Sequence, residues 1–254
     1  MNQKTKLLAG ITFGLVLALS PAYAQSLIFS TVTPTPGAND IYNLTAGAND
    51  SDNVSGGNDA ATYVAMDRDA AQGQTFTTGN NTGGYTLNGF WLQHALYQTS
   101  QGNGTWWNVN TAGAQLTFRL LDPTANSILD SASYTITGTE PNNFGQAPGA
   151  NSLGTGTWMY FTFGSPITLA ANTTYGLDLQ AAASPNFYFE LAGDNTDVYA
   201  GGSAYSTTRA GSTPTLNTGD HVFDVSLSTV PEPSTLALCG LGGLAFLFRR
   251  RVKN

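Results

Sequence analysis

Cysteine and lysine are absent from the central part, residues 25–230, of this 254-residue chain. The only cysteine, Cys239, lies near the C-terminus, so residues 25–230 cannot be held together by disulfide bonds and need a hydrophobic core instead. The same residues contain no lysine, and three arginines against fifteen acidic side chains give them a net charge of −12. This charge excludes nucleic acid and anionic lipid surfaces as partners, and it suits divalent cations, neutral glycans or simple solubility.

Side chains that commonly carry catalysis are also scarce. Residues 25–230 contain two histidines, His94 and His221, and two glutamates, Glu140 and Glu190. No Gly-x-Ser-x-Gly element occurs, and no spacing singles out a pair of carboxylates for glycoside hydrolysis. We therefore predict a body that is not an enzyme, and a secreted hydrolase is the third of three functional alternatives.

The C-terminus, by contrast, is apolar and then basic. Leu236–Phe248 is an uncharged run that would cover roughly 20 Å as a helix, and preceding polar residues can lengthen it. The arginines Arg249, Arg250 and Arg251 can reach the lipid headgroups and hold the end of the chain in the cytoplasm. We predict a single transmembrane helix over 235–248 and a basic, stop-transfer end over 249–254.

The N-terminus has the pattern of a secretory signal peptide. Lys4 and Lys6 precede an apolar stretch, and Ala22 and Ala24 flank Tyr23 as a small-x-small cleavage site. We predict that residues 1–24 are removed during export.

A short motif joins the body to the apolar tail. Val230, Pro231, Glu232, Pro233 and Ser234 begin the motif at 230–235, and the apolar helix and arginine cluster follow. This order resembles the PEP-CTERM sorting signal of Gram-negative bacteria, over about 25 of the 254 residues. The resemblance implies recognition and cleavage by an exosortase, a transient anchor in the inner membrane, and release to the cell surface or extracellular matrix of a bacterium that makes exopolysaccharide. The same tail is also labelled as the C-terminal region of ice-binding proteins, which implies no ice affinity for the body.

The body has the pattern of an all-β domain. Short segments rich in aromatic and β-branched residues alternate with Gly, Asn, Thr and Pro clusters, and Phe223, Val225 and Leu227 share one face of a strand while Val222, Asp224 and Ser226 share the other. Trp91 and Trp158 are expected in the core. The predicted strands lie near Ser26–Val32, Thr62–Met66, Gln74–Thr77, Thr86–Leu96, Gln115–Leu121, Ile128–Ile136, Trp158–Phe163, Tyr175–Gln180, Phe187–Leu191 and Val222–Leu227.

These strands predict a two-sheet, jelly-roll-like sandwich over residues 62–228. Gly73–Thr77, Tyr85–Phe90, Trp158–Phe163, Leu169–Tyr175 and Asp220–Asp224 resemble, in order, the strands of extracellular carbohydrate-binding-type jelly rolls. Residues 25–61 precede the predicted sandwich. Because residues 34–61 hold few large apolar side chains, we expect an N-terminal arm or a long Gly/Asn/Asp-rich loop there. Residues 229–254 form the sorting tail.

Oxygen-rich clusters raise the alternative of a calcium site. Asp50, Asp52 and Asp59 form one cluster, and Asp194 and Asp197 form another. Carboxylates and loop carbonyls are calcium ligands, but neither cluster has the spacing of a known calcium loop, and Asp and Asn in turns usually accept backbone hydrogen bonds.

A pair of tryptophans raises the alternative of glycan binding. Trp106 and Trp107 lie in a polar, glycine-rich stretch, where they either cap the core or form an exposed platform for a sugar ring. The sequence as a whole favours a non-catalytic surface or matrix protein with a structural or adhesive role linked to exopolysaccharide. A carbohydrate-binding module for a neutral glycan is the second alternative.

Overall fold

The computed structural model describes residues 25–45, 51–56, 71–93, 112–113, 115–137, 158–181, 187–194, 196–206, 215–216 and 218–231. These residues form antiparallel sheets and no helix, which confirms the all-β prediction for the described part of the body. No helix among them is long and apolar enough to cross a membrane. The predicted signal peptide and the predicted transmembrane helix lie outside the described residues.

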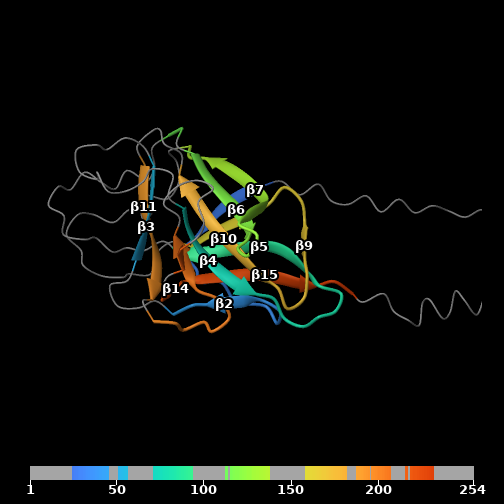
Figure 1. Ribbon diagram of the computed structural model, residues 1–254. Coiled ribbons are helices and arrows are strands. Elements are labelled where there is room, and N and C mark those ends of the chain that lie inside the picture. The colour runs from blue at the N-terminus through green and yellow to red at the C-terminus, as the bar shows by residue number, and fades with distance from the viewer. Residues whose placement is uncertain are drawn as a thin grey trace, which may run out of the picture.

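Two six-stranded sheets make up most of the described body (Figure 1). The first sheet has the order β1-β8-β5-β15-β2, and β9 pairs with β5 beside this path. The second sheet has the order β13-β12-β4-β10-β6-β7. The first sheet comprises β1 (Ser26–Ser30), β2 (Ile41–Asn43), β5 (Tyr85–Gln93), β8 (Trp158–Thr162), β9 (Ile167–Leu169) and β15 (Phe223–Thr229). The second comprises β4 (Ala71–Thr77), β6 (Gln115–Asp122), β7 (Ser127–Thr135), β10 (Thr174–Ala181), β12 (Ala204–Ser206) and β13 (Thr215–Leu216).

The main core lies between these two sheets. Phe90 and Phe161 of the first sheet stack with ring centroids 4.9 Å apart, and Phe118 of the second sheet packs against both, at 6.1 and 5.1 Å. All three rings are at most 1% exposed, and burying each contributes about 2–3 kcal/mol of hydrophobic free energy. The alternation predicted for Phe223, Val225 and Leu227 is confirmed, because all three belong to this core.

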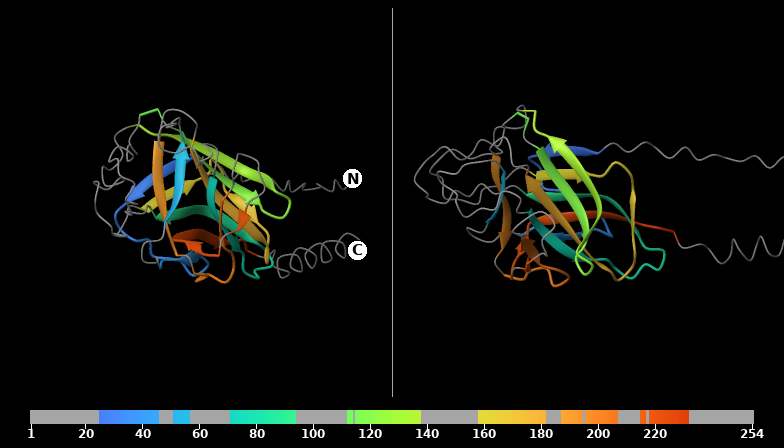
Figure 2. Two further views of the ribbon diagram at one scale, coloured as in Figure 1. Left: turned by 60° about the vertical axis from the view of Figure 1, so that its left-hand side comes forward. Right: turned by 45° about the horizontal axis from the view of Figure 1, so that its top comes forward.

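A third, three-stranded sheet, here called the end sheet, has the order β14-β11-β3. Its strands are β3 (Ser51–Gly56), β11 (Phe187–Asp194) and β14 (Asp220–His221). β3 and β11 lie side by side at the left of the described strands in Figure 1 and come to the front in the left view of Figure 2. Leu191 of β11 enters the main core, whereas Ala192 joins Trp158 and Val222 in a second, smaller cluster. The end sheet therefore contributes to both apolar clusters.

Nine of the ten predicted strands have a counterpart in the described residues, and the tenth, Thr62–Met66, lies outside them. The strands that the sequence does not predict are mostly short: β2, β3, β9, β12, β13 and β14. Residues 34–61, expected to be an arm or a loop, contain β2 and β3, and the predicted strand β1 precedes them. β2 pairs with β15 and β3 pairs with β11, so neighbouring strands supply the backbone hydrogen bonds that the local composition does not signal.

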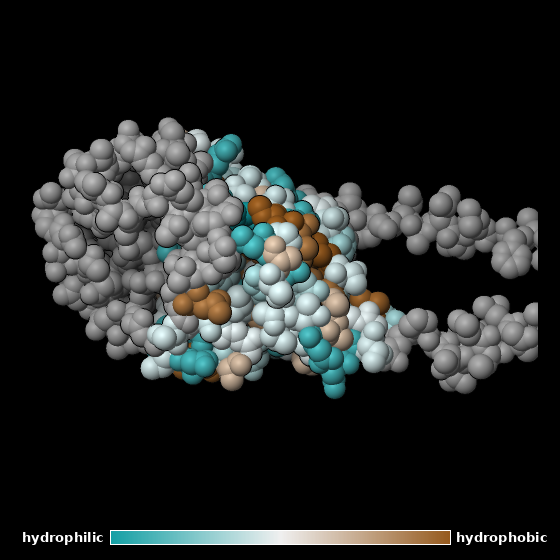
Figure 3. Space-filling view, viewed as in Figure 1, coloured by the Kyte–Doolittle hydropathy of each residue, from teal (hydrophilic) through white to brown (hydrophobic). Residues whose placement is uncertain are grey.

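Hydrophobic side chains also reach the surface of the second sheet. Ile128 and Leu129 of its edge strand β7 are about half exposed, at 52% and 49%. Figure 3 shows hydrophobic residues gathered in an elongated patch on the face where β6 and β7 lie in Figure 1. Neither of these exposed side chains belongs to the two apolar clusters.

Candidate functional site

Three aspartate side chains are buried among the described residues, and their surroundings differ. Asp178 is 0% exposed, and Asp220 and Asp224 are each 1% exposed. A buried carboxylate is costly unless hydrogen bonds or an opposite charge compensate it. How each of the three is compensated therefore separates structural acids from a candidate binding site.

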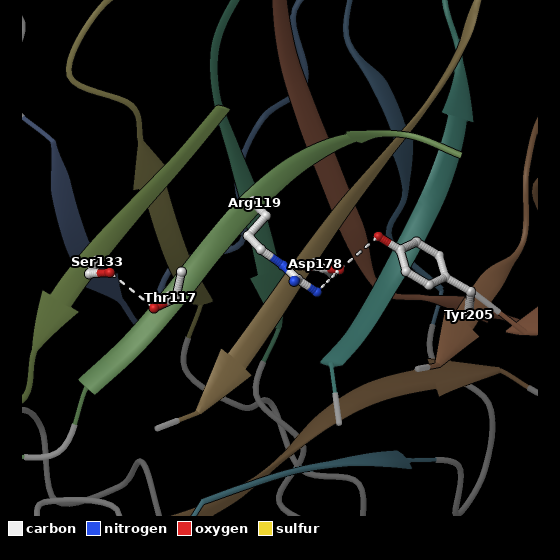
Figure 4. Close-up of polar contacts among 5 residues, drawn as sticks. All are labelled: Thr117, Arg119, Ser133, Asp178 and Tyr205. Carbon is white, nitrogen blue, oxygen red and sulfur yellow. Dashed lines mark hydrogen bonds and ion pairs between the residues drawn. The ribbon is translucent and has the colours of Figure 1, made fainter. Parts of the chain in front are cut away.

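Asp178 is fully paired on the outer face of the second sheet (Figure 4). Arg119 of β6 donates from Nε to Oδ1 and from Nη2 to Oδ2, both at 2.7 Å, and the Tyr205 hydroxyl donates to Oδ2 at 3.2 Å. Gly73 of β4 makes room for the tyrosine ring, because a Cβ there would lie 2.5 Å from Tyr205 Cζ. Burial alone lowers the pKa of Arg119, but the hydrogen bonds and charge of Asp178 outweigh it and raise that pKa. This group is a completed ion pair that fixes three strands.

Asp220 is satisfied by uncharged donors. Gln74 donates to its Oδ1 at 2.8 Å, and the backbone amides of Val198 and Tyr199 donate to Oδ2 at 2.9 and 2.8 Å. The carboxylate therefore attaches the segment after β11 to the second sheet, which is a structural role.

Asp224 of β15 lacks such compensation. Its Oδ1 is buried and has no hydrogen-bond partner among the described residues. Burial, and then the negative charge of Asp40, raise the pKa of the Asp224 carboxyl to about 7. Both oxygens of Asp40 are occupied, because they accept hydrogen bonds from the backbone amides of Gly37 and Leu227 at 2.7 and 2.8 Å. A buried acceptor without a donor marks a candidate ligand site.

Aromatic side chains flank Asp224 across the sheet. Strand register places Tyr160 opposite Trp91, Trp91 opposite Asp224, and Asp224 opposite Tyr42, and Ile28 of β1 is opposite Tyr160. Directly paired residues share a face, and this face is the outer one because the alternate residues belong to the core. We call Tyr160, Trp91, Asp224 and Tyr42 the aromatic row.

Two rings of the aromatic row, Trp91 and Tyr160, contact each other, and all three rings are partly accessible. The Trp91 and Tyr160 centroids are 4.5 Å apart with planes tilted by 32°, and Tyr42 is 49% exposed. The prediction that Trp91 lies in the core is wrong in part: it is half-buried on the outer face and packs against the smaller cluster that contains Trp158. Trp158 itself is buried as predicted, at 2% exposure.

A glycine positions Tyr160 in this row. A Cβ at Gly89 of β5 would lie 2.6 Å from both Cζ and Oη of Tyr160, so the phenol crosses the sheet above this glycine. Burial raises the pKa of Tyr160, a hydrogen bond with Ser226 opposes the rise, and the charges of Asp224 and Asp40 add to it. The phenol thus lies near both acids.

The residues predicted as calcium ligands are placed only in part. Asp194 Oδ1 accepts hydrogen bonds from the amide and hydroxyl of Thr196 at 2.9 and 2.6 Å, which lower the pKa of Asp194. Asp197 is exposed, and Asp52 lies in β3 opposite Leu191. In the described ranges, no group of three His, Cys, Asp or Glu side chains could hold a metal ion. Asp50 and Asp59 lie outside those ranges.

Most of the other predicted site residues also lie outside the described part of the chain. These are Ala22, Ala24, Trp106, Trp107, Glu232, Pro233, Ser234, Arg249, Arg250 and Arg251. The aromatic row was not predicted as a site. The one local signal was the alternation in β15, which places Asp224 away from the core.

The first residues of the sorting motif are attached to the body. β15 ends at Thr229, and the Val230 amide donates to the carbonyl of Gly84 at 3.1 Å. The Asn81 side-chain amide donates to the carbonyls of both Val230 and Gly84. Gly84 has φ +79°, a conformation that favours glycine. We call Asn81, Gly84 and Val230 the tail clamp.

A family model for the PEP-CTERM protein-sorting motif matches residues 229–251. This match confirms the resemblance for the tail. It begins at Thr229, the last residue of β15 and the residue before Val230 of the tail clamp. No curated protein matches the chain. The motif defines an exported protein that is sorted to the cell surface, and it implies processing by an exosortase.

Proposed function

We propose that this chain is a non-catalytic protein of a Gram-negative cell surface or extracellular matrix, with a structural or adhesive role linked to exopolysaccharide. The observation that carries the proposal is the sorting motif at residues 229–251, which begins at the last residue of the last strand of an all-β body. A signal peptide over 1–24 and a temporary helical anchor over 235–248 belong to the same proposal. Cleavage would then release a body whose net charge of −12 keeps it soluble and away from anionic lipid.

The buried acids support a structural role over a catalytic one. Asp178 and Asp220 have their carboxylate oxygens engaged by protein donors, so neither is available to a substrate. The hydrolase alternative would need two carboxylates about 5–10 Å apart beside a sugar, with one of them free to protonate the leaving group. Asp40, whose negative charge raises the pKa of Asp224, accepts hydrogen bonds from two backbone amides, so its oxygens are already engaged.

A carbohydrate-binding module of jelly-roll type is the second candidate. The aromatic row favours it, because partly exposed rings beside hydrogen-bonding groups suit the apolar faces and hydroxyls of a neutral glycan. Trp106 and Trp107 remain predicted contributors to such binding.

Mass spectrometry of the surface protein tests the proposed sorting. The full chain is expressed in a host with the processing enzyme and in the same host without it. We expect the mature protein to lose the residues that follow the motif only in the first host. Recovery of mature surface protein that still carries Phe248 in both hosts would contradict the proposal.

Co-sedimentation tests the proposed matrix role. Mature protein is mixed with cells that make exopolysaccharide and with matched cells that lack it. We expect sedimentation with the first cells alone, and equal recovery from both would contradict the matrix role.

A further inference from the structure

We propose that the aromatic row binds a glycan chain that carries free amino groups, with an ammonium group paired to Asp224. This inference rests on the proposed glycan-linked role and specifies the ligand class and the residues that bind it.

The direction of the row indicates a chain-like ligand. Its residues come from four neighbouring strands, β8, β5, β15 and β2, and Ile28 of β1 continues the line with 53% exposure. With strands about 4.8 Å apart, the line from Ile28 to Tyr42 covers roughly 19 Å across the sheet. That length exceeds a single sugar and suits several consecutive rings, each able to place an apolar face on an aromatic side chain.

The chemistry at the centre of the row indicates a positively charged donor. An ionised carboxylate accepts hydrogen bonds and donates none, and Asp224 Oδ1 has no donor among the described residues. An ammonium group supplies both donors and charge, and aromatic rings attract cations over their faces. The corresponding carboxyl on the second sheet, Asp178, receives hydrogen-bond donors and a positive charge from Arg119. On the first sheet, the ligand would take the place of that arginine.

Charge in the surroundings excludes acidic glycans. Asp40 adds a second negative charge close to Asp224. Arg119 is the one arginine or lysine side chain in the described ranges, and it is already paired on the other sheet. A uronic-acid chain would meet two acids without a compensating cation, whereas an amine-bearing chain would be attracted.

Access to Asp224 requires movement of the groups that cover it, because the side chain is 1% exposed. Tyr42 is half exposed on the three-residue edge strand β2, which pairs on one side only with β15. Trp91, in contrast, is held between Tyr160 and the smaller apolar cluster. Tyr42 is therefore the ring best able to yield to a ligand.

Calorimetry on the full chain in mild detergent tests the inference with three probes of equal length: a glucosamine oligomer, its N-acetylated counterpart and a glucose oligomer. We expect the glucosamine oligomer to bind at least tenfold more tightly than the other two. Asp224→Asn should remove that preference, and Trp91→Ala and Tyr42→Ala should weaken all binding. The pairing needs an ionised Asp224 carboxyl, whose pKa burial raises to about 7, and a protonated amine, which loses its proton a little above neutral pH. The preference should therefore be largest near pH 7, fall toward about pH 5 and about pH 9 in wild type, and be absent throughout in Asp224→Asn.

The control variant is Ile128→Ala, which removes an exposed side chain on the edge of the second sheet and should leave binding unchanged. Thermal melting of each variant separates loss of binding from loss of folding. Equal affinity for the amine-bearing and N-acetylated chains would overturn the inference, and so would an Asp224→Asn variant that keeps the preference. If neutral chains bind through Trp91 and Tyr42 alone, the inference fails while the proposed glycan-linked role stands. If no probe binds but co-sedimentation with exopolysaccharide persists, the row is not the site and the proposed role again stands.

Discussion

The outer faces of the two large sheets carry a similar arrangement of residues but differ in the donors around the buried acid. On each face a tyrosine crosses a glycine toward a buried acid: Tyr205 crosses Gly73 to reach Asp178, and Tyr160 crosses Gly89 toward Ser226 and Asp224. Asp178 has an arginine, and Asp224 has none among the described residues. The comparison teaches that burial alone does not distinguish a structural acid from a binding site, whereas the set of donors around it does.

Removing the arginine beside Asp178 should cause the largest loss of stability, because it leaves both of these buried acids without a cation in the described part of the chain. Arg119→Ala leaves Asp178 buried without its cation, and we expect a loss of about 3–5 kcal/mol in the free energy of unfolding. Urea unfolding at pH 7 measures this loss. The double variant Arg119→Met with Asp178→Leu is the control, since apolar side chains of similar size should recover most of the stability. A loss below about 1 kcal/mol in Arg119→Ala would mean that the pair is not a structural unit.

Crowding the two glycines tests whether both tyrosines depend on them. Gly73→Ala places a Cβ within 2.5 Å of the Leu177 carbonyl and Tyr205 Cζ, and Gly89→Ala places one within 2.6 Å of the Phe161 carbonyl and Tyr160 Cζ. Both contacts involve backbone, so we expect each variant to lose about 1–3 kcal/mol by chemical unfolding. Gly164→Ala is the matched control, because its Cβ would meet nothing within 4 Å. Wild-type stability in either variant would show that the tyrosine is not fixed by the glycine.

Neutralising the acids should have opposite effects on the two sheets. The folded-state pKa of Asp224 is about 7, above its ordinary unfolded value near 4, so the folded protein holds a proton that the unfolded chain releases between these pH values. Stability therefore falls as pH rises from about 4 to about 7. We expect Asp224→Asn to stabilise the protein at pH 8 by about 2 kcal/mol and to flatten this part of the pH profile.

Asp178→Asn is the control for that measurement. It removes the charge that compensates Arg119, so it should destabilise at pH 8 where Asp224→Asn stabilises. Thermal melting from pH 4 to pH 9 compares the three proteins. A destabilising Asp224→Asn at pH 8 would show that the ionised carboxylate has a partner in the folded protein.

The sequence predicts the long strands well because their pattern is local. Leu116, Phe118 and Leu120 alternate with polar or charged residues, and all three are fully buried in the core. The alternation in β15 also places Asp224 opposite the core. Its burial is not predictable from the strand itself, since Tyr42, Trp91 and Tyr160 come from three other strands and meet it only through strand register.

The short strands and the completed ion pair escaped prediction for a related reason. Ile41–Asn43 is too short to show a period, and its strand exists because β15 offers a free edge. Arg119 and Asp178 are 59 positions apart, and nothing local links them. The Asp194 cluster, in contrast, followed the ordinary behaviour of aspartate in turns, as its hydrogen bonds to Thr196 show.

The smallest expected effect concerns the tail clamp, which lies at the boundary between the folded body and the sorting tail. Asn81→Ala removes the side-chain donor to the Val230 and Gly84 carbonyls, and we expect a loss of about 1 kcal/mol or less in global stability. The local effect should be larger, and the segment at Val230 and Pro231 should become more sensitive to limited proteolysis. The variant loses one of the two attachments of this segment to the body, and the hydrogen bond from the Val230 amide to the Gly84 carbonyl remains. The exposed neighbour Asn80→Ala is the control, and it should leave the cleavage rate near Val230 unchanged. Equal rates in wild type and Asn81→Ala would mean that β15 alone fixes where the folded body ends and the sorting motif begins.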